Sequence, residues 1–169
     1  MRKNKTSFLV LSSLVAIATL AALPSCKKSN SSSPGGMSAS LNSTAFQATF
    51  TTGVDFKVFN QLTMAGLMIK GSDSNYLEIQ FPDTAKINHP MTISNYDAIW
   101  IDYYPKGKVN GYFYEASDLD GSCTITLTSL DTVGHKVSGT FSGVLKNFSG
   151  GTDSVVINNG QFNASYIAH

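Results

Sequence analysis

The residue types that carry most enzyme chemistry are present in this chain of 169 residues, but their spacing matches no catalytic or metal-binding pattern. His89, His135 and His169 are far apart in sequence and show no ligand spacing. No serine lies in a Gly-x-Ser-x-Gly motif, and residues 139–143 have the wrong spacing for a nucleophile elbow. We therefore expect no catalytic residues, no metal and no cofactor, and we predict that the protein is not an enzyme.

A calcium loop is the nearest match to a metal motif. The segment Asp118-Leu119-Asp120-Gly121 echoes part of an EF-hand loop. In that alignment the first and twelfth ligand positions fall on Ala116 and Leu127, so both end carboxylates are missing. Asp and Gly are also common turn residues, and a β-turn is the better interpretation.

One cysteine stands where a covalent modification is expected. Three basic residues lie among the first five, an apolar run covers residues 8–23, and Cys26 follows small residues. This arrangement resembles the lipobox of bacterial lipoproteins, in which the thiol is alkylated by a diacylglyceryl group and the preceding peptide bond is cut. The run is short for a transmembrane helix, which needs about 20 residues. We predict a signal peptide over residues 1–25 and lipidation of Cys26.

The segment after the cysteine predicts how the protein is attached. Residues 26–36 are polar, rich in Gly and Ser, and broken by Pro34, which is typical of a flexible tether. Many surface-exported lipoproteins of Bacteroidota-type bacteria carry acidic residues just after the cysteine, whereas Lys27 and Lys28 stand here. The sequence therefore favours an outer-membrane lipoprotein on the periplasmic face over one on the cell surface. Its membrane contact is the lipid, not a spanning segment.

Composition argues against nucleic acid as a partner of the mature chain and against a disulfide within it. Removing 25 of 169 residues leaves 144, enough for one domain with its own core. Twelve basic residues fall to nine while eleven acidic residues stay, so the net charge is about −2 and no basic stripe suits nucleic acid. With Cys26 assigned to lipid, Cys123 has no cysteine with which to form a disulfide. We expect a monomer.

Alternation of apolar and polar residues predicts a single all-β domain over residues 37–169. Residues 62–70 and 76–81 are joined by the turn-forming residues 71–75 and predict a hairpin. Cys123, Ile125 and Leu127 share one face, which predicts Cys123 as a small core residue and not a reactive thiol. We predict an antiparallel β-sandwich, with a calycin-like closed β-barrel as the alternative.

The last third of the chain predicts two further features. An inward strand face is expected from alternate residues between 137 and 145, where Gly139 and Gly143 permit a bend or the close approach of a neighbouring backbone. Beyond it, Asn158-Asn159-Gly160 predicts the turn of a final hairpin.

Aromatic residues give the strongest hint of a binding face. Two adjacent expected strands hold Trp100, Tyr103, Tyr104, Tyr112 and Tyr114. Tyrosine and tryptophan supply rigid, amphipathic contact area at binding faces. Ordinary strand propensity with core packing is the other interpretation.

Modification at a second kind of site is also expected. Thr84, Thr132 and Ser154 each follow an aspartate and precede an apolar residue. This pattern resembles the O-glycosylation acceptor of Bacteroides-like bacteria, and all three positions fall near expected turns.

Two runs near the end of the chain resemble a known family. Residues 137–143 and 155–162, together with residues 39–46, resemble small Bacteroidota lipoproteins that share a domain of unknown function. The resemblance implies an all-β fold and an envelope address, and it implies no activity. The function we expect is a non-enzymatic module that binds an envelope protein or glycan. A carrier of a small apolar ligand is the alternative.

Overall fold

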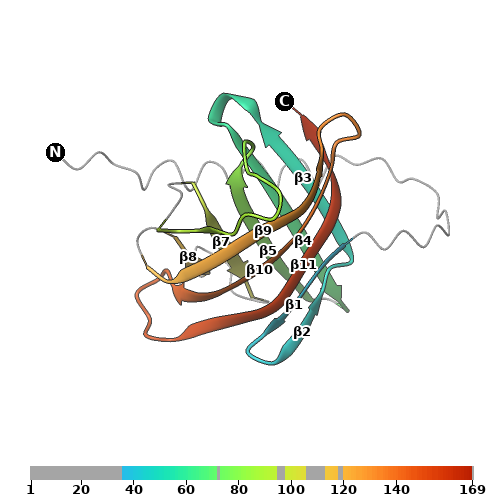
Figure 1. Cartoon of the computed structure of the whole chain (residues 1–169). Helices are drawn as coiled ribbons and strands as arrows, with labels where there is room; N and C mark the ends of the chain where they lie inside the picture. Colours follow the sequence, from blue (N-terminus) through green and yellow to red (C-terminus); the bar gives the residue numbers. More distant parts are fainter. Residues whose placement is uncertain (1–35, 72, 95–97, 106–112, 118–119, 169) are drawn as a thin grey trace. The chain divides into compact units, whose positions relative to one another are not determined.

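A computed structural model describes residues 36–71, 73–94, 98–105, 113–117 and 120–168. The described residues are almost entirely β-strand, so the predicted all-β fold class is confirmed (Figure 1). Within these ranges no helix is both long and apolar enough to cross a membrane. The strands are β1 (Gly36–Leu41), β2 (Thr44–Gln47), β3 (Phe50–Phe56), β4 (Gln61–Lys70), β5 (Asp73–Pro82), β6 (Met91–Thr92), β7 (Trp100–Tyr104), β8 (Tyr114–Ala116), β9 (Ser122–Asp131), β10 (Lys136–Asn147) and β11 (Ser154–Ala168), and the short 3-10 helix η1 (Lys57–Phe59) lies between β3 and β4.

The strands belong to one sheet that folds back on itself. Their order is β2-β1-β11-β3-β4-β5-β7-β8-β10-β9-β6, and a further pairing joins β11 to β10. This pairing completes a hydrogen-bonded ring of β3, β4, β5, β7, β8, β10 and β11. The pairing of β11 with β3 is parallel, unlike the fully antiparallel sheet that we predicted. The fold therefore has features of both predicted alternatives, the sandwich and the closed barrel. One half of the sheet consists of β3, β4, β5, β7 and β8, and the other half contains β10 and β11. The pairings of β11 with β3 and of β10 with β8 join the two halves at two corners.

The core lies between the two halves of this sheet. Phe81 of β5 and Phe162 of β11 come from opposite halves, and their ring centroids are 5.9 Å apart. Cys123 is buried in the same cluster, as its alternation with polar neighbours predicts. Every residue of the cluster lies between Met37 and Tyr166, and residues 34–169 form one compact unit.

The predicted β4–β5 hairpin is confirmed, but the predicted final hairpin is wrong. β11 continues through Asn158-Asn159-Gly160 and pairs with β10 on both sides of this segment. Asn159 has a left-handed φ of 52°, and the register shifts between Phe141 and Gly143. Asn158 and Asn159 therefore stand opposite the single residue Ser142 and form a β-bulge. The long partner strand keeps the chain extended where a turn would reverse it.

Gly139 allows the close strand approach that its position predicts. A Cβ atom there would lie 2.6 Å from the Thr126 carbonyl oxygen and 2.5 Å from Cζ of Phe162. We expect Gly139→Ala to lower the free energy of unfolding by about 1–3 kcal/mol, because backbone and core must shift. At Gly36 the nearest atom to an added Cβ is 3.7 Å away, so Gly36→Ala is the matched control. Urea denaturation measures both, and equal stability of the two variants would contradict this packing.

Candidate functional site

Charged side chains stand in a row on the sheet face that points away from the core. Leu77 and Ile79 belong to the core, so Glu78 between them points to the opposite face. Glu78 pairs in register with Asp102 of β7, and Asp102 pairs with Glu115 of β8. Side chains of in-register residues lie on the same face. We call Glu78, Asp102 and Glu115 the carboxylate row.

The carboxylate row is buried although it lies outside the core. Glu78 is 1% exposed, and Asp102 and Glu115 are each 5% exposed. Burial of ionised carboxylates is unfavourable unless they are paired or hydrogen-bonded. Other side chains on this face of the sheet are also buried, namely those of Gln61, Thr63, Gln80 and Trp100.

Burial changes the acid strength of the row. It raises the pKa of Glu78 to about 7, although the Tyr76 hydroxyl donates a hydrogen bond to Glu78 Oε2 at 2.6 Å and opposes the increase. Burial also raises the pKa of Asp102 well above its usual range, and the charges of Glu78 and Glu115 raise it further. A hydrogen bond from Tyr104 acts on the pKa of Asp102 in the opposite direction. Added positive charge would relieve this cost.

Among the residues that the structure describes, two oxygen atoms on this face lack a hydrogen-bond partner. They are Oδ1 of Asp102 and Oε1 of Gln80. The Gln80 side chain uses its Nε2 atom to donate to Oε1 of Gln61. Lys57 is the basic residue of the ion pairs found in the described ranges, and it pairs with acids outside the row. The face therefore offers buried acceptors that a hydrogen-bond donor with positive charge would satisfy.

The geometry of the row suits recognition better than metal binding. In-register neighbours lie about 5 Å apart, so three such residues form a line and do not surround one point. Within the part of the chain that the structure describes, no group of three or more His, Cys, Asp or Glu side chains is arranged to hold a metal ion.

One end of the row opens into a cleft. The cleft has a volume of about 180 Å³ and is lined by Glu115, Ser117, Asp120, Lys146, Asn147, Phe148 and Gly150. It lies at the corner where β8 pairs with β10, and Lys146 pairs in register with Glu115 there. Small-molecule sites usually enclose about 300–1,000 Å³. This cleft is therefore closer in size to one inserted side chain than to a free ligand.

Stacked aromatic rings connect the row with the cleft. The rings of Tyr104 and Phe113 are stacked with centroids 5.1 Å apart, and those of Phe113 and Phe148 with centroids 4.6 Å apart. Tyr104 is also the residue that donates to Asp102. Phe148 lines the cleft and is 40% exposed, so its ring is open to a ligand at this corner.

The described members of the predicted aromatic binding group do not share one face of the sheet. Tyr103 pairs in register with Leu77 and Tyr114, so it lies on the core side, where its ring stacks on that of Tyr114. Trp100 and Tyr104 share the outward face with Asp102. Tyr112 and the predicted lipidation site Cys26 lie outside the described residues.

Local sequence patterns do not mark several residues of the site. Glu78 is one of the polar residues that alternate with apolar ones over residues 76–81, and no motif includes Glu115 or Phe148. The signal that unites them is the register of three strands. Alternation within one strand does not reveal which residues of other strands stand beside it.

The remaining candidate residues lie elsewhere in the fold. Burial raises the pKa of the Cys123 thiol to about 12, which keeps it protonated and poorly nucleophilic. Of the predicted O-glycosylation positions, Thr84 and Thr132 are exposed in turns. Ser154 is half-buried at the first residue of β11 and not in a turn.

Comparisons with known proteins do not identify a relative that would assign a role to these residues. No family model, no curated protein and no solved structure matches the chain. What the site can do is inferred from its geometry and chemistry.

The raised pKa of Glu78 predicts a pH-dependent stability. Its carboxyl titrates near 4.5 in a solvated chain and near 7 in the folded protein. Between these values the folded state keeps a proton that the unfolded state has lost, so the free energy of unfolding falls as pH rises from about 4.5 to 7. The loss is roughly 3 kcal/mol, because each pKa unit corresponds to about 1.36 kcal/mol.

Glu78→Gln should therefore flatten the pH dependence and stabilise the protein at pH 8 more than at pH 5. Glutamine is nearly isosteric and can still accept the bond from Tyr76. Asp131→Asn leaves Glu78 intact and is the control, with the wild-type slope expected. Urea midpoints measured from pH 4.5 to 8 provide the test. A destabilised Glu78→Gln variant at pH 8 would contradict the cost assigned to this carboxylate.

Proposed function

We propose that this protein is a lipid-anchored binding module of the cell envelope and not an enzyme. In this proposal the carboxylate row and the adjoining cleft receive a basic side chain of an envelope protein. The observation that carries the proposal is the in-register, buried placement of Glu78, Asp102 and Glu115, with the row ending in an open cleft. A guanidinium or ammonium group would add positive charge beside the row and a donor for Oδ1 of Asp102.

The cleft chemistry favours arginine over lysine as the inserted side chain. A guanidinium presents donors in a planar fork that matches a carboxylate, and it also stacks on aromatic rings. Glu115 and Phe148 both line the cleft and supply one group of each kind. Asp120 adds a second acid to the lining, which offsets the charge of Lys146.

The alternative function, a carrier of a small apolar ligand, has less support. A carrier needs an interior space of several hundred cubic ångströms. Here large side chains from both halves of the sheet meet between them, as the 5.9 Å separation of the Phe81 and Phe162 rings illustrates. The cleft of about 180 Å³ lies at the β8–β10 corner and has polar residues in its lining.

The cellular location of the protein is part of the same proposal. We propose that a lipid on Cys26 holds the domain at the periplasmic face of the outer membrane, and that residues 26–36 act as a tether. A monomer on such a tether can turn its cleft toward partners in the periplasm. The resemblance to small Bacteroidota lipoproteins supports this address.

The proposed site predicts saturable binding of a cationic peptide. Trp100 is the single tryptophan of the chain and lies on the same outward face as Asp102, so its fluorescence reports on the row. We expect hexa-arginine to change this fluorescence saturably, with affinity falling as salt is raised. Hexa-serine should have no effect.

Variants of the row provide the specificity test for this peptide. Asp102→Asn combined with Glu115→Gln should weaken hexa-arginine binding at least about tenfold, because two charge-assisted contacts are lost. Asp131→Asn removes one charge away from the row and should bind like wild type. An absent wild-type response, or equal affinity of the row variant, would rule out the proposed site.

The proposed anchor predicts a defined intact mass. Protein purified from the envelope of its host should have the mass of the chain from Cys26 plus a diacylglyceryl group, and usually one further acyl group. Cys26→Ser should remain unlipidated and should no longer partition into detergent. A native mass that includes residues 1–25, or that lacks lipid, would contradict this anchor. The same spectrum tests whether at least one of Thr84, Thr132 and Ser154 carries a sugar, as the sequence predicts.

A further inference from the structure

Three apolar side chains project from two turns at one end of the sheet, and we propose that this end contacts the surface of a lipid bilayer. Val58 and Phe59 belong to η1, and Val133 lies in the turn between β9 and β10. Val58 is 86% exposed, Val133 is 89% exposed and Phe59 is 49% exposed. We call Val58, Phe59 and Val133 the apolar tip.

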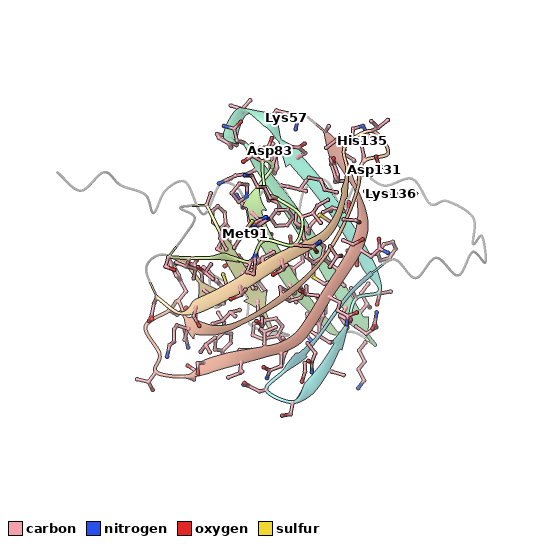
Figure 2. The ribbon with its side chains drawn as sticks, viewed as in Figure 1. Lys57, Asp83, Met91, Asp131, His135 and Lys136 are labelled. Carbon is pink, nitrogen blue, oxygen red and sulfur yellow. The ribbon has the colours of Figure 1, made fainter. Side chains whose placement is uncertain are left out.

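The two turns lie at the same end of the sheet. Gly53 of β3 pairs with Tyr166 of β11, and β3 leads directly into η1. Tyr166 also donates its backbone N–H to the carbonyl oxygen of His135, which follows Val133 in the other turn. Figure 2 shows Lys57 and Asp83 at the same end as His135. The apolar tip is therefore one feature of the fold although its residues are far apart in sequence.

Lys57 and Asp131, which lie beside the apolar tip, are engaged in contacts within the protein. Lys57 Nζ lies 2.6 Å from Asp55 Oδ2 and 3.2 Å from Asp83 Oδ2. Asp131 Oδ1 accepts hydrogen bonds from the backbone N–H groups of Val133 and Gly134 at 3.1 and 2.8 Å. These contacts fix the shape of both turns. They also lower the cost of bringing the charges close to an apolar medium.

The predicted lipid anchor favours a bilayer as the surface that the apolar tip contacts. β1 begins at Gly36, which pairs with Asn163, three residues before Tyr166 and so about 10 Å along β11. The segment 26–35 reaches at most about 35 Å when extended. A lipid on Cys26 can therefore enter the same bilayer that the apolar tip touches. This step rests on the proposed lipid anchor and is independent of the carboxylate row.

Side chains that project from turns suit a shallow contact with lipid. Apolar groups of peripheral proteins enter the headgroup and acyl boundary by about 5–10 Å. A weak contact of this kind becomes populated when a tether keeps the tip near the membrane. The effect would be to fix the orientation of a domain that the tether alone leaves free.

The test uses residues 34–169 without lipid, because this unit contains every residue of the core. We expect sedimentation with phosphatidylcholine vesicles at millimolar lipid. Val58→Asp combined with Val133→Asp should lower the partition coefficient at least about tenfold, because both apolar contacts are lost. Val156→Asp is the matched control, since Val156 is exposed on β11 outside the tip. It should partition like wild type.

Several outcomes would overturn the inference. One is the absence of wild-type binding to the vesicles, and another is equal partition of the Val58→Asp/Val133→Asp variant. A sugar found on Thr132 of the native protein would also count against it, because the sugar would stand next to Val133. The hexa-arginine response of the same variant should stay at the wild-type level. This separates failure of the tip from failure of the proposed binding site.

Discussion

The pairing of β10 with β8 is the contact on which the site depends. It joins the two halves of the sheet at one corner and aligns Lys146 with Glu115 and Asn147 with Tyr114. The cleft lies at this corner, and Glu115 is shared between the cleft and the carboxylate row. Because Glu115 is also in register with Asp102, and Asp102 with Glu78, the corner sets where the row ends. A closed ring of strands fixes these registers more firmly than an open sheet edge would.

The two faces of the β5–β7–β8 region follow different physical rules. On the inner face, Leu77, Ile79 and Ile101 pack in the core and stabilise the fold. On the outer face, Glu78 and Asp102 are buried with raised pKa values and oppose folding at neutral pH. A fold selected for stability alone would replace them with neutral residues. Their presence would be explained if these carboxylates lower the stability of the free protein and bind a positively charged group of a partner. The apolar tip would follow the same principle with a smaller effect, because it leaves apolar surface in contact with water in the absence of a bilayer.

Sequence patterns predicted the individual strands of this fold better than the pairing and register between strands. Alternation over residues 76–81 and 123–127 gave strands with the correct inward faces, since the period of two is a property of one strand. The same alternation separates Tyr103 from Trp100 and Tyr104, although their crowding in sequence suggested one surface. The Asn158-Asn159-Gly160 segment shows the limit of local signals, because its left-handed residue serves a bulge as well as a turn. Glu115 lies in a strand of three residues, too short for any periodicity, so only strand register places it in the row.

We propose that a bound basic side chain stabilises the ionised form of the carboxylate row. Carboxyl ¹³C NMR titration of the folded protein with and without hexa-arginine tests this proposal most directly. We predict that the Glu78 carboxyl titrates near pH 7 in the free protein and that saturating peptide shifts this pKa downward, because a nearby cation favours the ionised form. A Glu78 pKa near the ordinary 4.5, or one that saturating peptide leaves unchanged, would contradict the account.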